Sequence, residues 1–258
     1  MRYNAGMTPS WVDQRDHRVR FEWGPAGAEA VRSDVVVIVD VLRFTTAVDA
    51  AVSAGVAVHP HRWRDPSAGA LAARVGAHLA DGTDGAPSLS PASLVALGRG
   101  ARVVLPSPNG STCAVLAADA GATVVAACLR NAAAVSTWLN ARAPTTVTVV
   151  ACGERWHDGS LRPALEDQLG AGAVIAGLDG DRSPEAQAAA AVWHGAGGRV
   201  ADVLRACSSG REQQQRGWAD DLRYAEAVDA SSAVPVLRDG AFVDARCPTD
   251  VRPVDRRR

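Results

Sequence analysis

Up to about residue 178, short apolar runs alternate with longer segments of helical periodicity. The apolar runs predict strands at 18–23, 35–39, 56–58, 102–105, 123–127 and 145–151. The segments between them predict helices at 43–54, 67–79, 112–120, 131–141 and 163–178. Strands that alternate with helices in this way are typical of βαβ units. The pattern therefore predicts an α/β fold, with three layers (α/β/α) around a largely parallel sheet and a mixed sheet as the alternative.

The rest of the chain is mainly helical. We expect helices at 184–194, 198–206 and 211–229, then a hairpin that turns at Asp239-Gly240, a dipeptide that favours a type I′ turn. The first and last predicted strands divide the chain into an N-terminal extension at 1–17, a domain at 18–246 and a C-terminal tail at 247–258. We expect 18–246 to form a single unit, and a second, helical lobe from about residue 183 is the alternative.

The strand at 35–39 leads directly into polar residues. Its sequence, VVVIV, is typical of a strand that is buried on both faces, and Asp40 follows at once. Ligands of open α/β sheets bind at the carboxyl ends of the strands. Arg43, Thr45 and Thr46 then open the next predicted helix. An acid, a base and hydroxyl groups so close together indicate a site for an anionic ligand, with or without a metal ion.

The segment PSPNGST at 106–112 joins a strand to a helix. Gly110 allows a ligand to approach the backbone closely, and Ser111 and Thr112 place amides and hydroxyl groups in the first helical turn. Helix N-termini of this kind bind phosphate through their amides and the helix dipole. Asn109 would lie at the same edge of the sheet as Asp40. The alternative is an ordinary Asn-Gly turn with a serine cap.

Two further segments combine capping residues with groups that could bind a ligand. Asn131 follows the strand at 123–127, where it can cap the next helix, bind ligand beside Asp40, or do both. The sequence SSGR at 208–211 ends one predicted helix and starts another. Ser208 and Ser209 can therefore cap a helix or, together with Arg211, bind an anion.

Glu166 and Asp167 lie in the first turn of a predicted helix that is otherwise almost wholly apolar. Acidic residues are favoured in a first turn by the helix dipole, so their position alone does not indicate function. Two adjacent acids at the ligand edge of the sheet can also supply the hard oxygen ligands that Mg²⁺ prefers. Both interpretations remain open at this point.

Composition excludes several classes of function. The formal net charge of the 258-residue chain is -1, which gives no electrostatic basis for binding nucleic acid or an anionic membrane. No apolar run reaches the roughly 18 residues of a membrane span. The five cysteines are scattered, which favours reduced thiols and a cytoplasmic location. The chain contains no lysine, so lysine Schiff-base chemistry is excluded. Any anion that is held by a side-chain cation is expected to be held by arginine.

Several of these motifs occur together, in the same order, in one family. The chain resembles the 2-phosphosulfolactate phosphatases in VVIVDVLRFTTAV (36–48), PSPNGST (106–112), CLRNAAAV (128–135), VVACGER (149–155), LEDQLGAGAVIAGL (165–178) and SSGR with GWADDLRYAEAVD (217–229). It departs from the family where RWRDPSAGALAAR (62–74) lacks the family's Gly/Glu/Arg-rich loop and where LSP (89–91) has Leu89 in place of asparagine. The resemblance implies a Mg²⁺-dependent phosphatase associated with coenzyme M biosynthesis, acting on 2-phosphosulfolactate.

The resemblance also suggests roles for individual residues. Asp40, with Glu166 or Asp167, would hold Mg²⁺. Phosphate oxygens would be bound by Arg43, Thr45, Asn109, Gly110, Ser111, Thr112 and Asn131, with Ser208 and Arg211 as further candidates. We expect Arg43→Ala to keep the fold and to lower turnover strongly.

Two alternatives stay open. The departure at 89–91 leaves room for a phosphatase with a different phospho-hydroxy-acid substrate. The missing Gly/Glu/Arg-rich loop also leaves room for a non-catalytic anion-binding or regulatory module. The partner expected in each case is a small anionic molecule, and the alanine-rich helices would suit a homo-oligomer.

Overall fold

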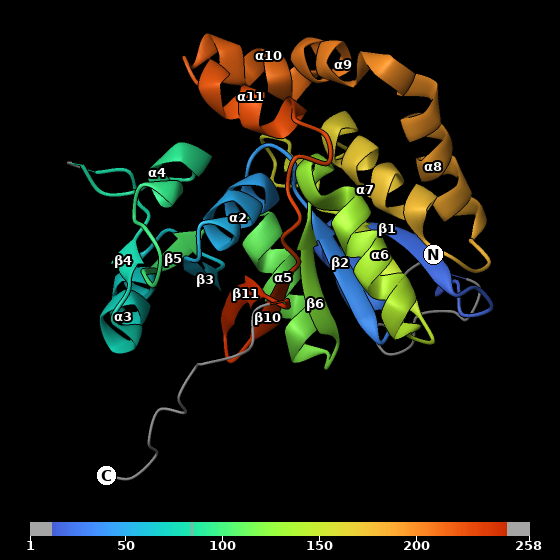
Figure 1. Cartoon of the computed structure of the whole chain (residues 1–258), viewed down its shortest axis with the longest axis horizontal. Coiled ribbons are helices and arrows are strands. Elements are labelled where there is room, and N and C mark those ends of the chain that lie inside the picture. Colours follow the sequence, from blue (N-terminus) through green and yellow to red (C-terminus); the bar gives the residue numbers. More distant parts are fainter. Residues whose placement is uncertain (1–11, 84, 247–258) are drawn as a thin grey trace, which may run out of the picture.

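The computed structural model describes residues 12–83 and 85–246 (Figure 1). The predicted tail at 247–258 and most of the predicted extension at 1–17 lie outside the described residues. The strands are β1 (Val19–Trp23), β2 (Val35–Val39), β3 (Ala57–His61), β4 (His78–Leu79), β5 (Arg102–Pro106), β6 (Thr123–Ala127), β7 (Val147–Ala151), β8 (Glu154–Arg155), β9 (Leu161–Arg162), β10 (Pro235–Arg238) and β11 (Ala241–Asp244). The α-helices are α1 (Gly24–Ala30), α2 (Phe44–Ser53), α3 (Pro66–Val75), α4 (Pro91–Val95), α5 (Gly110–Asp119), α6 (Ala132–Arg142), α7 (Leu165–Gly177), α8 (Pro184–Ala196), α9 (Val200–Ala206), α10 (Ser208–Gln215) and α11 (Ala219–Glu226). Two short 3₁₀ helices, η1 (Leu129–Asn131) and η2 (Gly197–Arg199), precede α6 and α9.

The main sheet is mixed, and its strand order is β1-β7-β2-β6-β10-β11-β3-β5-β4. Two parallel blocks, β1-β7-β2-β6 and β3-β5-β4, are separated by the antiparallel hairpin β10-β11. The hairpin pairs with each block through one residue pair, Val236 with Val125 and Phe242 with Val58. The three-layer α/β/α fold predicted from the sequence is confirmed, with the mixed sheet that it left as the alternative (Figure 1).

Helices cover both faces of the sheet because the central strands are apolar on both sides. Val35, Val37 and Val39 of β2 pack in one core with α6, α7 and α8. Val36 and Ile38 pack in a second core with α1, α2 and α5. Every residue of β2 is buried, as the unbroken run VVVIV predicts for a strand between two helical layers.

Two predicted helices are wrong in extent, each because of a glycine. The helix predicted at 67–79 ends at Val75, since Gly76 takes a left-handed conformation, and β4 follows and pairs with β5. The helix predicted at 211–229 is two helices, α10 and α11, separated by Gly217 with φ of 77°. The predicted hairpin turn is confirmed, since Asp239 and Gly240 both have positive φ.

The structure also contains elements that the sequence did not predict. Helix α1 begins directly after β1, and the small hairpin β8-β9 follows β7. Within the described ranges, no helix combines the length and the apolar character that crossing a bilayer requires.

Candidate active site

Asp40 is held by the starts of two helices. It follows β2 and is buried. Its Oδ1 accepts a hydrogen bond from the Phe44 amide at 3.1 Å, and its Oδ2 accepts one from the Gly110 amide at 2.9 Å. Burial raises the pKa of Asp40 to about 6, although these two hydrogen bonds act in the opposite direction. The hydroxyl of Thr45 bonds to the main chain of Asp40, accepting from its nitrogen at 2.9 Å and donating to its oxygen at 2.8 Å.

The first turn of α5 presents donors that have no acceptor. Gly110 uses its amide on Asp40, and the hydroxyl of Ser111 donates to the Leu105 carbonyl at 2.9 Å. No described residue accepts a hydrogen bond from the amides of Ser111 or Thr112. The hydroxyl oxygen of Thr112 is also buried without a partner. Buried polar groups are normally paired, so these donors indicate a place for a ligand or ordered water.

Gly110 leaves no room for a side chain. A Cβ at this position would lie 2.2 Å from Cδ1 of Phe44 and 2.8 Å from Oδ2 of Asp40. We expect Gly110→Ala to displace the start of α5 from Asp40 and to destabilise the protein by about 1–3 kcal/mol, as overpacking does. Urea unfolding would measure the change in free energy.

The matched control is Gly69→Ala in the middle of α3. A Cβ at Gly69 meets nothing within 4 Å, so alanine should be neutral or stabilising by about 0.5–1 kcal/mol. Equal changes in unfolding free energy for the two substitutions would show that the close approach of α5 to Asp40 does not require glycine at position 110.

Asp167 joins two loops at the carboxyl edge of the sheet. Its Oδ1 accepts from the amide of Val41 at 2.7 Å, and its Oδ2 accepts from the amide of Gly153 at 2.8 Å. These amides follow β2 and β7, which are neighbours in the sheet. Burial raises the pKa of Asp167 well above its ordinary value, and the charges of Asp40 and Glu166 add to the effect. Asp167 therefore holds the loop that carries Asp40 next to the loop that follows β7.

Glu154, which the sequence analysis did not select, lies beside Asn109. Its Oε2 accepts a hydrogen bond from Nδ2 of Asn109 at 2.9 Å. Burial raises the pKa of Glu154 to about 7, and the charge of Asp40 adds to the effect. Glu154 and Asn109 line a cavity of about 220 Å³ together with Trp23, Cys152 and residues of α1. A half-protonated carboxyl in a cleft has the properties of a general acid or base.

Glu166 reaches the segment between α9 and α10. The thiol of Cys207 donates to Oε2 of Glu166 at 3.4 Å. Ser208 and Arg211, both proposed from the sequence as anion ligands, are exposed on α10. The neighbouring Ser209 is buried instead, and its hydroxyl accepts from Arg162 of β9 at 3.2 Å. The structure therefore brings Arg162, a cation that the sequence analysis did not select, to this segment.

Arg43 is engaged in a buried ion pair. Its guanidinium pairs with Asp221 of α11 and lies 4.0 Å from the centre of the Trp218 ring. The side chains of Arg43 and Asp221 are 11% and 6% exposed. Asp221 also accepts a hydrogen bond from Ser90, next to the Leu89 at which the chain departs from the family pattern. Breaking a buried pair leaves an uncompensated charge, so the expectation that Arg43→Ala preserves the fold needs revision.

Asn131 occupies the N-cap position of α6, as predicted, but its side chain makes no capping hydrogen bond to that helix. Its side chain instead bonds to three main-chain groups in two segments, accepting from Cys128 N at 2.8 Å and donating to the carbonyls of Ala126 and Ala233 at 3.3 Å each. It is fully buried. These bonds use the amide to connect the end of β6 to the segment before β10.

The carboxylates fit Mg²⁺ only in part. Across residues 12–83 and 85–246, no three His, Cys, Asp or Glu side chains form a ready metal-binding group. Asp40 and Asp167 each use both oxygens on main-chain amides. Mg²⁺ commonly binds through one or two carboxylates, with water and substrate phosphate as the other ligands. The donor set fits that kind of site and not a cage of three carboxylates.

The residues missed by the sequence analysis differ in how they could have been found. Glu154 follows β7 just as Asp40 follows β2, so the rule that ligands bind at strand ends applies to it equally. Arg162 and Asp221 have no such local signal. Each is placed by a contact with a distant segment, Arg162 by its hydrogen bond to Ser209 and Asp221 by its ion pair with Arg43.

Comparison with known proteins links most of the chain to one family. A family model described as 2-phosphosulpholactate phosphatase matches residues 26–240. A probable 2-phosphosulfolactate phosphatase of Gloeobacter violaceus is 33% identical over 136 residues, which cover 53% of this chain and 55% of that protein. A protein of Deinococcus radiodurans with the same description is 30% identical over 149 residues, which cover 57% of this chain and 60% of that protein. The chain thus spans little more than half the length of these relatives.

Proposed function

Because the chain belongs to the 2-phosphosulfolactate phosphatase family, we propose that it hydrolyses a small anionic phosphate monoester, with 2-phosphosulfolactate as the preferred substrate. The products would be sulfolactate and inorganic phosphate. The observation that supports this most directly is the group of unpaired donors in the first turn of α5, next to Asp40.

The start of α5 would bind the phosphoryl group. The amides of Ser111 and Thr112 and the Thr112 hydroxyl provide three hydrogen-bond donors, and the helix dipole favours an anion there. Asp40 would repel a phosphate dianion at this position unless a cation or a proton intervenes. This requirement for charge compensation is the physical reason to expect a divalent cation at the site.

The residues that would hold Mg²⁺ are Asp40 and Glu166, with Asp167 in a supporting role. When bound, the ion would neutralise charge on the phosphoryl oxygens. Asp167 would contribute mainly by positioning, since its oxygens join the loops after β2 and β7. Arg43 is fixed by Asp221 near this edge, and Arg162 is the further cation available for the carboxylate or sulfonate of the substrate.

Glu154 is our candidate for proton transfer. Water attacks phosphorus, the bond from phosphorus to the ester oxygen breaks, and the leaving oxygen takes a proton from the Glu154 carboxyl. The hydrogen bond from Asn109 holds that carboxyl in the cavity. A pKa of about 7 leaves Glu154 partly protonated at neutral pH, as a general acid requires.

Replacing Glu154 with glutamine tests this role. Because its raised pKa leaves Glu154 protonated below about pH 7 and ionised above it, wild-type kcat/KM should fall as pH rises through about 7. Glu154→Gln should lower kcat about a hundredfold and remove this alkaline fall. Rates measured between about pH 5 and 9 would show both effects. Glu212→Gln, on the exposed face of α10, is the control, and an unchanged alkaline limb in Glu154→Gln would reject the assignment.

Phosphate release tests the proposed function itself. Racemic 2-phosphosulfolactate would be assayed beside 2-phospholactate and 3-phosphoglycerate, with Mg²⁺ and with EDTA. Mg²⁺-dependent release that favours the sulfonate is the expected result. Preference for another ester would keep the chemistry and reassign the substrate, as the departure at Leu89 would allow. No release from any ester, with phosphate still bound, would instead indicate an anion-binding module.

A further inference from the structure

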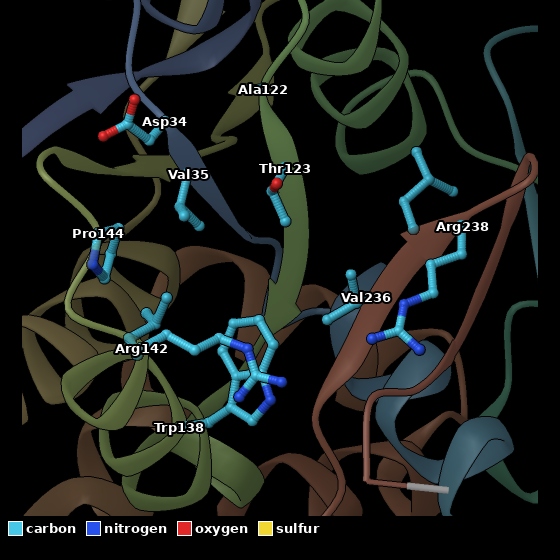
Figure 2. Close-up of a pocket in the computed structure, with 11 residues that line it drawn as sticks. Asp34, Val35, Ala122, Thr123, Trp138, Arg142, Pro144, Val236 and Arg238 are labelled. Carbon is cyan, nitrogen blue, oxygen red and sulfur yellow. The ribbon is translucent and has the colours of Figure 1, made fainter. Parts of the chain in front are cut away.

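A second hollow lies at the opposite end of the central strands from Asp40. It has a volume of about 530 Å³ and opens where β2 and β6 begin, next to the end of α6 (Figure 2). We call it the amino-end pocket. Its lining includes Asp34, Thr123, Trp138, Arg142, Val236 and Arg238. Since β2 has five residues and a strand rises about 3.3 Å per residue, the pocket and Asp40 are separated by roughly 15–20 Å.

The pocket results from an interruption in the sheet. Val236 of β10 pairs with Val125 of β6, and no further pair between these strands is formed. A continued antiparallel ladder would place Arg238 opposite Thr123. The strands separate there instead, and Arg238 and Thr123 both line the hollow. The opening is therefore a feature of the main chain and does not depend on one flexible side chain.

The polar groups around the pocket are mainly donors. Within residues 12–83 and 85–246, neither Arg142 nor Arg238 forms an ion pair. Arg142 lies over the Trp138 ring, 3.9 Å from its centre. The indole nitrogen of Trp138 is buried and has no hydrogen-bond partner. The one lining acid, Asp34, already accepts from the amide of Thr146 at 2.9 Å. The pocket is thus lined by two arginines without ion pairs and by one carboxylate, of which one oxygen is already hydrogen-bonded.

The rest of the lining is apolar. Val35, Leu139, Pro144 and Val236 also line the hollow, and in Figure 2 Val236 lies between Arg142 and Arg238. A volume near 500 Å³ is in the range of small-molecule sites, which combine apolar walls with a few polar groups. It exceeds what a bare inorganic anion would fill.

We propose that the amino-end pocket is a second ligand site, for a small organic anion that has an apolar or aromatic body and one acidic group. The acidic group would receive charge-assisted hydrogen bonds from Arg142 and Arg238. An acceptor on the ligand would pair with the indole nitrogen of Trp138. The body would displace water from the apolar walls. This site is separate from the proposed phosphatase site and does not depend on that function.

The probe for the test is 8-anilinonaphthalene-1-sulfonate, which combines an aromatic body with a sulfonate and fluoresces when bound. We expect saturable binding of one equivalent to the native full chain. Arg142→Gln and Arg238→Gln should each weaken binding about tenfold, because each removes a charged hydrogen bond. Trp138→Phe keeps an aromatic ring beneath Arg142 but removes the indole donor and part of the fused ring, so it should weaken binding about fivefold.

The control is Arg223→Gln, since Arg223 is an exposed arginine on α11, 78% accessible and distant in the fold from this pocket. It should leave probe affinity unchanged. The three pocket variants should also retain wild-type phosphate release, if the chain has that activity, and a wild-type melting temperature. Absence of saturable binding, or affinities within twofold of wild type for all three variants, would overturn the proposal. Displacement of the probe by inorganic phosphate would place it at α5 and would overturn it too.

Discussion

Asp40→Asn will lower kcat/KM for phosphate release about a thousandfold, equivalent to about 4 kcal/mol of transition-state stabilisation. Asp40 is buried at the end of β2, and it joins the starts of α2 and α5 through its two oxygens. Asparagine has the same shape but cannot supply a negative charge to a cation or accept hydrogen bonds at both positions. Steady-state assays with and without added Mg²⁺ would measure the loss.

The same variant should remain folded. Burial raises the pKa of Asp40 from 3.8 to about 6, so its contribution to stability is fully present below about pH 4 and is lost as pH rises through about 6. For the ligand-free protein at pH 8, the loss is on the order of 3 kcal/mol, which asparagine would avoid. Asparagine also turns its NH2 group toward one of the two amides that donate to Asp40, which costs about 1–3 kcal/mol. The two effects offset each other, so we expect the melting temperature of Asp40→Asn at pH 8 to be close to that of the wild type.

The exposed substitution Asp202→Asn is the control for both measurements. It should change neither activity nor melting temperature. Activity of Asp40→Asn within tenfold of the wild type would remove Asp40 from the reaction. Loss of activity together with unfolding at pH 8 would instead assign it a structural role at the junction of α2 and α5.

Arg43→Ala will destabilise the protein by about 3–5 kcal/mol, because it leaves Asp221 buried without its partner. The substitution also removes the contact of the guanidinium with the Trp218 ring. Chemical denaturation of Arg43→Ala, Asp221→Ala and the double variant would measure the coupling between the two charges. Each single change should be costly, and the double variant should be more stable than the sum of the single effects predicts.

Activity of the double variant separates two roles for Arg43. If Arg43 also binds phosphate, the double variant stays inactive even though stability is partly recovered. Recovery of activity along with stability would limit Arg43 to holding α11 against the loop after β2. Arg223 and Asp220 form an exposed pair and provide the control cycle, for which we expect no measurable coupling. Additive effects at Arg43 and Asp221 would contradict the ion pair.

Much of the fold follows from local pattern. The run at Val35–Val39 had to be a strand with both faces covered, because every residue in it is apolar and β-branched. The Asp239-Gly240 turn followed from the tolerance of these residues for positive φ. In contrast, the breaks at Gly76 and Gly217 were missed, since the flanking residues keep a helical pattern across each glycine.

For the candidate site, the sequence identified the groups at strand ends more readily than their partners. Asp40 and Gly110 were both selected, and the structure places them in a direct hydrogen bond. Asn131 makes no side-chain cap because its Oδ1, the atom that would accept from the first turn of α6, accepts from the amide of Cys128 instead. The metal-binding and phosphate-binding roles stay predictions until the variants above are measured.

By itself, the sequence determined the α/β class, the order of the central elements and the placement of Asp40, Asn109 and Glu166 next to element ends. These depend on periodicity and turn chemistry, which act over a few residues. Only the tertiary structure decided that the hairpin β10-β11 separates two parallel blocks, that Arg43 pairs with Asp221, and that Glu154 titrates near neutrality. These depend on which distant segments pack together and on how much water that packing removes from a charge.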